Sequence, residues 1–97
     1  MSIRDQLLLS IADELDRSAN LTEDVGANVA AAMDFTPENL DKLQSIDVSA
    51  QTQRIIAMLL RDLIQSPPER CLERIGMETL RRRLVAGLGA VMVEGAA

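Results

Sequence analysis

Asp47 and Gln51 are the two residues of this chain whose types and spacing best suit chemistry. They stand four positions apart in a run that contains no Gly or Pro between Pro37 and Pro67. Residues four apart in an α-helix are neighbours on its surface. A carboxylate accepts hydrogen bonds and pairs with cations, and a glutamine amide both donates and accepts without titrating. Such a pair could orient a polar group or a water molecule. The simpler interpretation is a solvated helix face with a weak Asp–Gln hydrogen bond.

The segment that must position this pair is a predicted long helix, residues 37–65. Thr36 is a good N-cap, Pro37 suits the first helical position, and Glu38 favours the positive end of the helix dipole. Pro67 and Pro68 end the pattern. One stripe of apolar residues, typical of the seam of a helical bundle, contains Leu43, Ile46, Ala50, Ala57, Leu60 and Ile64.

Residues 1–33 form the first arm of a predicted antiparallel hairpin, and Ser2 with Asp5 gives its start signal. Residues 18–26 are ambiguous, because Asn20, Thr22 and Gly26 could break the helix, with Thr22 as the cap of a second piece. We favour one helix to about Met33. Its apolar spacing begins with Ile3, Leu7, Leu8, Ile11 and Leu15 and continues through Leu21, Val25 and Val29. The turn follows at residues 34–36, where we expect Phe35 to plug the end of the hairpin.

A third helical segment is predicted at residues 68–86, and Gly76 could divide it, since Gly disfavours helix by about 1 kcal/mol relative to Ala. Residues 87–97 form a tail that either frays or covers the bundle. Arg81, Arg82 and Arg83 either cap the last helical turn or dock an acidic protein surface. The predicted fold is therefore all-α and a single domain over residues 1–97. Either the third segment completes a bundle within the chain, or two hairpins join into a four-helix bundle; we favour the homodimer.

Composition excludes several classes of function. The 97 residues carry a net charge of −5, which argues against nucleic acid or an anionic membrane as the partner. There is no His and only one Cys, Cys71, so a phosphorylatable histidine, the usual zinc sites and a Ser-His or Cys-His nucleophile are all absent from the sequence. The single Cys fits a reducing cytoplasm, and no signal peptide or membrane-spanning run is recognisable.

The Asp-x-x-x-Gln pattern of residues 47–51, inside a long helix of a helical hairpin, resembles the active-site signature of the CheZ-type chemotaxis phosphatases. Leu43-Gln44-Ser45-Ile46 precedes the pattern, and Arg54, Ile55, Ile56 and Met58 follow it. The chain also resembles the short CheT-type chemotaxis phosphatases. The resemblance covers residues 37–66 well and the first arm only in pattern.

This resemblance implies a phosphatase that stimulates dephosphorylation of a phospho-aspartyl, CheY-like response regulator. Gln51 would position the attacking water, and Asp47 would pair with the receiver's lysine. Gln44, Arg54 and Met58 would contact the partner. The chain would need no cofactor of its own, because Mg²⁺ is supplied in the receiver domain; other chemotaxis proteins could assist. The competing interpretations are a non-enzymatic helical adaptor, which binds a chemotaxis signalling protein through the same face, and a purely structural dimerisation module.

Overall fold

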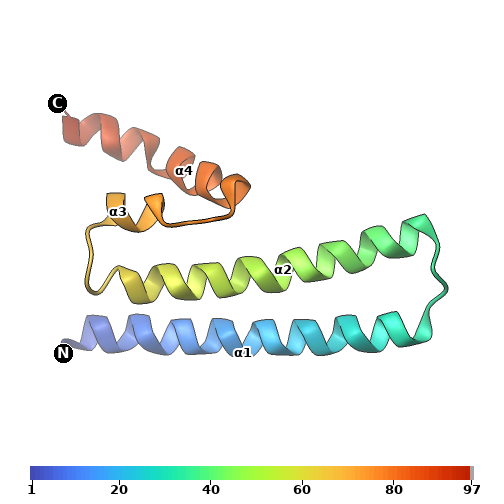
Figure 1. Ribbon diagram of the computed structural model, residues 1–97. Coiled ribbons are helices and arrows are strands. Elements are labelled where there is room, and N and C mark those ends of the chain that lie inside the picture. The colour runs from blue at the N-terminus through green and yellow to red at the C-terminus, as the bar shows by residue number, and fades with distance from the viewer. Residues whose placement is uncertain (97) are drawn as a thin grey trace.

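Four helices joined by short loops make up residues 1–96, the part of the chain that the computed structural model describes; for residues 90–96 it describes the backbone alone (Figure 1). They are α1 (Ile3–Ala32), α2 (Pro37–Asp62), α3 (Pro68–Glu73) and α4 (Glu78–Ala96). Helices α1 and α2 lie side by side and antiparallel over most of their length. The predicted all-α hairpin is therefore confirmed. The molecule is elongated, with extents of 55 × 30 × 17 Å.

The start signals of both long helices act as predicted. The hydroxyl oxygen of Ser2 accepts a hydrogen bond from the backbone N–H of Asp5 at 3.0 Å, and that of Thr36 accepts one from the N–H of Asn39 at 3.2 Å. Helix α1 continues without a break to Ala32, so the favoured single helix is confirmed. Phe35 is 77% exposed, so the prediction that it plugs the hairpin end is wrong. Polar contacts close the turn instead, among them a 2.8 Å hydrogen bond from the side chain of Asn39 to the carbonyl of Asp34.

Small residues form the contact between the two long helices. Ala12, Ala19 and Gly26 are buried on α1, and Ala50 and Ala57 are buried on α2. Each set repeats every seven residues, which keeps it on one side of its helix. Small side chains let two helix backbones approach closely, so more of the chain comes into contact.

None of the larger apolar residues of α1 is fully buried in this contact. The predicted helical spacing of these residues is confirmed, but they divide between two environments. Ile3, Leu7 and Ile11 are 88%, 59% and 42% exposed, whereas Leu8 and Leu15 are half-buried. Of the predicted α2 stripe, Ala50 and Ala57 are buried and the other members are half-buried. The reason is steric, since the alanine side of α1 permits the closer approach.

Charged groups from α2 fasten it to α1 on one flank of this contact. One terminal nitrogen of Arg61, Nη2, donates to Oδ2 of Asp16 at 2.7 Å and to Oδ1 of Asp13 at 2.9 Å. These hydrogen bonds, first that of Asp16, raise the pKa of Arg61 above its usual value. Because the arginine side chain is 36% exposed, solvent screens both pairs, and they orient the helices more than they stabilise the fold.

The C-terminal region departs from the single segment predicted at residues 68–86. Helix α3 ends at Glu73, residues 74–77 are not helical, and α4 begins at Glu78. Gly76 lies in the break, as its low helix propensity allows. Burial favours the break as well, because Ile75 is only 9% exposed and the sulfur of Met77 lies 3.5 Å from Oγ1 of Thr52 on α2. The predicted tail belongs to α4 up to Ala96, and residue 97 lies outside the described residues.

Helix α2 also ends earlier than predicted, at Asp62 rather than at residue 65. The next residues form a tightened turn, in which the N–H groups of Gln65 and Ser66 both donate to the carbonyl of Asp62, at 3.0 and 2.9 Å. The two prolines that follow cannot continue a helix. No helix of residues 1–96 combines the length and the apolar character that a membrane crossing requires.

Candidate functional site

Asp47 and Gln51 are both exposed, one turn apart on α2, and both line an open groove of about 580 Å³ between the two long helices. They lie close to the middle of α2, away from its ends. The other residues that line the groove are Leu43, Ala50 and Arg54 from α2 and Glu23, Gly26, Ala27 and Ala30 from α1. Three of the five residues predicted to form the site, Asp47, Gln51 and Arg54, are thus brought together.

The groove exists because the helix opposite Gln51 carries small residues. Gly26, Ala27 and Ala30 are consecutive members of the α1 wall, and none has a side chain longer than one methyl group. Ala50 continues this floor on α2. These small residues of α1 therefore leave open surface beside the polar pair.

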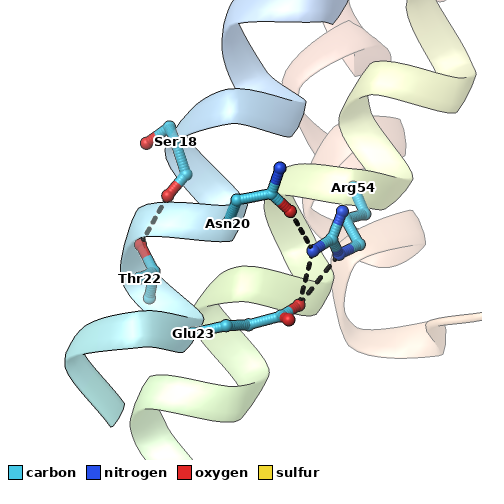
Figure 2. Close-up of polar contacts among 5 residues, drawn as sticks. All are labelled: Ser18, Asn20, Thr22, Glu23 and Arg54. Carbon is cyan, nitrogen blue, oxygen red and sulfur yellow. Dashed lines mark hydrogen bonds and ion pairs between the residues drawn. The ribbon is translucent and has the colours of Figure 1, made fainter. Parts of the chain in front are cut away.

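Arg54, which lines the groove, is held by α1, and Figure 2 shows its contacts with Asn20 and Glu23. Its Nε and Nη2 atoms donate to Oε1 of Glu23 at 3.0 and 2.7 Å, and Nη2 also donates to Oδ1 of Asn20 at 2.7 Å. The planar guanidinium suits such a fork of acceptors, whereas a lysine ammonium would not reproduce it. On the same stretch of α1, the hydroxyl of Thr22 donates back to the carbonyl of Ser18 at 2.9 Å, so it does not break the helix.

The electrostatics of the groove follow from this pairing. Glu23 and Asp47 bring two negative charges and Arg54 brings one positive charge, which Glu23 already engages. No described residue forms an ion pair or a side-chain hydrogen bond with Asp47, and the same holds for the amide of Gln51. Both groups are therefore available to an incoming molecule, and the negative charge of Asp47 favours a cation.

Gln44 and Met58 lie outside this groove. Gln44 lines a second hollow of about 670 Å³, whose lining includes Arg83 from α4. Met58 is 63% exposed and borders a smaller hollow of about 310 Å³ beside α3. The two nevertheless align with Gln51, because residues 44, 51 and 58 are seven apart and lie along one side of α2. A partner lying along that line would meet all three.

The sequence prediction missed the residues that α1 contributes, above all Glu23 and Gly26. A signal for part of them is present in the sequence. Arg54 and Arg61 are seven residues apart, and so are their acceptors, with Glu23 seven residues after Asp16. A repeat of basic residues on one arm that matches a repeat of acidic residues on the other fixes the register of an antiparallel pair.

Among residues 1–89, whose side chains the structure describes, no group of three or more metal-ligating side chains is close enough together to hold a metal ion. The arrangement offers a hydrogen-bonding amide and a carboxylate on an open surface. It can therefore orient a water molecule or a group of a partner. No protein-family model, curated protein or solved structure matches this chain.

Proposed function

We propose that this protein is a phosphatase that stimulates the hydrolysis of the aspartyl phosphate of a CheY-like response regulator in bacterial chemotaxis. The observation that carries the proposal is the pair of Asp47 and Gln51, which are exposed one turn apart in an open groove and have no described partner of their own. The resemblance of this pair to the CheZ-type signature supplies the reaction. Because receivers are cytoplasmic, the protein would act in the cytoplasm.

The reaction requires a water molecule in line with phosphorus. The water oxygen attacks phosphorus, the bond between phosphorus and the receiver's aspartate oxygen breaks, and the products are inorganic phosphate and the free carboxylate. Positioning and charge neutralisation supply most of phosphoryl-transfer catalysis. The receiver's own Mg²⁺ and lysine neutralise charge, so the partner has only to orient the water. The amide of Gln51 can do this, since its oxygen accepts from the water and its nitrogen can donate to the phosphoryl group.

Asp47 would orient the receiver as it binds. Its carboxylate, one turn before Gln51, would pair with the receiver's active-site lysine. The pair fixes how deeply Gln51 enters, and a small displacement of a positioned group is costly to the rate. Gln44 and Met58 would add contacts along the same side of α2. Arg54 would stay paired with Glu23. Because of this ion pair, Arg54 would not compete with the receiver's lysine for the carboxylate of Asp47.

The direct test is the decay of a phosphorylated chemotaxis receiver in the presence of Mg²⁺. We expect the wild-type protein to accelerate the decay and Gln51→Ala to abolish the acceleration while binding is retained. Gln65→Ala removes the same amide from an exposed position outside the groove, so it should leave the acceleration unchanged.

Two results would contradict the proposal. Binding of the receiver without acceleration by the wild-type protein would favour the helical adaptor, which uses the same face without catalysis. A Gln51→Ala variant that accelerates decay as well as the wild-type protein would remove Gln51 from the mechanism.

A further inference from the structure

A stripe of large apolar side chains runs along a side of α1 that the contact with α2 leaves exposed. Its members and their exposed fractions are Ile3 88%, Leu7 59%, Ile11 42%, Leu21 62%, Val25 56% and Val29 37%. The two halves of the stripe are 18 residues apart, which is five turns of an α-helix, so the stripe runs parallel to the helix axis. The stripe consists of two apolar patches, residues 3–11 and 21–29, with the exposed polar residues Glu14 and Ser18 between them. Large apolar side chains that gather on one exposed side of a helix mark an interaction site.

We infer that this stripe joins two copies of the chain through an antiparallel α1–α1′ contact, with the two-fold axis level with Asp16. The inference is independent of the proposed activity. The spacing of the stripe fits this symmetry, because an antiparallel pair centred at residue 16 sets Ile3 against Val29 of the second copy. The same register sets Leu7 against Val25 and Ile11 against Leu21. Every stripe residue thus meets an apolar partner, as an isologous interface requires.

A hollow on the surface of α1 fits the same register. An apolar hollow of about 430 Å³ is lined by Leu7, Ser10, Ile11, Glu14 and Leu15. In the antiparallel pair, Leu21 of the second copy lies level with Ile11, in the middle of this hollow. Leu21 is 62% exposed and so projects from its own helix. Each copy therefore offers one projecting leucine and one hollow that receives the other's.

Charge at the centre of the stripe favours the antiparallel over the parallel arrangement. Glu14 lies within the stripe and Arg17 at its edge, and in one chain they form only a loose, exposed contact of 3.8 Å. In the antiparallel pair, Arg17 of each copy comes within about one residue's rise, roughly 1.5 Å along the axis, of the level of Glu14 of the other. Two ion pairs between the copies then form at the two-fold axis. A parallel pair would set Glu14 against Glu14, which is repulsive.

The contact would cover six large apolar side chains of each copy, which are 37–88% exposed in the single chain. The dimer also leaves the groove of Asp47 and Gln51 open. At about 100° per residue, Ala27 in the groove wall is about 160° around α1 from Val25 in the stripe. Ala30 is about 140° from Val25, so these two residues of the groove wall lie on the side of α1 opposite to Val25, while Gly26 is buried against α2.

The experiment measures molar mass by analytical ultracentrifugation over a range of concentrations. We expect a dimer for the wild-type protein and an increase of the dissociation constant by at least roughly tenfold for Leu7→Glu, because two charges enter the interface of each dimer. Gln6→Glu adds the same charge next to Leu7, but away from the stripe, and should leave the dimer intact. A monomeric wild-type protein, or a dimer that Leu7→Glu does not weaken, would overturn the inference.

Mixing and cross-linking test the register. Val25→Lys alone should weaken the dimer as Leu7→Glu does. A mixture of the two variants should form heterodimers in which the introduced glutamate of one chain faces the introduced lysine of the other, and native mass spectrometry identifies them. In a Cys71→Ser background, the double variant Leu7→Cys/Val25→Cys should form disulfide-linked dimers, since Cα atoms within about 7 Å can be bridged. Neither single variant should do so. Linked dimers of the single variants would show a parallel pair and overturn the register.

Discussion

Gly26 of α1 packs against Ile46 of α2, at a point where the space between the two long helices is too small for a further side-chain atom. A Cβ atom built on Gly26 would lie 2.9 Å from Cγ2 of Ile46, closer than real Cβ contacts occur. Gly26 is also part of the groove wall opposite Gln51. The close approach at this glycine therefore helps to set the distance between the polar pair on α2 and the α1 wall.

Gly26→Ala should destabilise the protein, although alanine is the better helix former. The propensity gain is about 1 kcal/mol, and overpacking in a tight contact costs about 1–3 kcal/mol. We expect a net loss of about 1 kcal/mol, which lowers the melting temperature by roughly 4–8 °C in a domain of this size. Thermal unfolding followed by circular dichroism measures it. The Cγ2 atom is close to the backbone of a β-branched residue, so it cannot move aside without a shift of the helices.

Two variants control this prediction. Gly87→Ala, in α4, has no neighbouring atom within 4 Å of the added Cβ, so it should be neutral or stabilising. Ile46→Ala removes the contacted methyl group, and in that background Gly26→Ala should become stabilising. If Gly26→Ala alone raised the melting temperature, the close contact between the helices would be disproved.

The Arg54–Glu23 contact should contribute a modest coupling energy. Its two short hydrogen bonds favour it, but the arginine and glutamate side chains are 37% and 50% exposed, so solvent screens the charges. We expect a coupling of about 0.5–1 kcal/mol from a double-mutant cycle with Arg54→Ala and Glu23→Ala. Arg54→Lys should recover little of it, since the ammonium cannot form the fork. The Arg74–Asp62 pair, at 3.6 Å, is the control and should couple less; equal couplings would contradict the argument.

The sequence predicted the helices well where a local signal defines them. Thr36 and Pro37 set the start of α2, and the structure shows the predicted cap. The region around Gly26, which was ambiguous in the sequence, belongs to one continuous helix. The glycine does not form a turn; its lack of a side chain lets Ile46 pack closely against α1. Local patterns report these features since caps and prolines act within a few residues of themselves.

The packed face of α1 could not be predicted in the same way. Hydropathy ranks Leu7 above Ala12, yet Ala12 is buried and Leu7 is exposed. Which face of a helix is packed within the chain depends on how closely its neighbour can approach, and that is a property of two segments together. The candidate site divides similarly. Asp47 and Gln51 were predicted from their own spacing. Glu23 lies beside them because it binds Arg54, which is 31 residues away in the sequence.

Asp47→Asn should weaken the binding of the receiver more than it slows the chemical step. The substitution keeps the shape of the side chain and removes the charge that would pair with the receiver's lysine. We expect KM to rise about tenfold, or 1.4 kcal/mol, with little change in kcat, measured from the rate of phosphate release against receiver concentration. Asp41→Asn, exposed on the other side of α2, is the matched control. A fall in kcat with unchanged KM would give Asp47 a role in the chemical step instead.

The beginning of α4 should lose stability in acid. Hydrogen bonds from Arg81, with a further one from Arg82, lower the pKa of Glu78 from 4.5 to about 2. Since the folded value lies below the unfolded one, this carboxylate stabilises the fold fully above about pH 4.5, and the contribution is lost as the pH falls towards 2. Carboxyl carbon shifts of Glu78 measured by NMR over this range give its pKa directly.

Removing the arginine that donates most strongly tests the cause of this shift. In Arg81→Leu, the hydrogen bonds from Nε and Nη2 at 2.9 and 2.6 Å are gone, so the pKa of Glu78 should rise towards its usual value. Arg82→Leu removes one 3.2 Å bond and should raise it less. The loss of helix signal in acid should then begin at a higher pH in Arg81→Leu than in the wild-type protein. An unchanged Glu78 titration in Arg81→Leu would show that the ion pair does not form in solution.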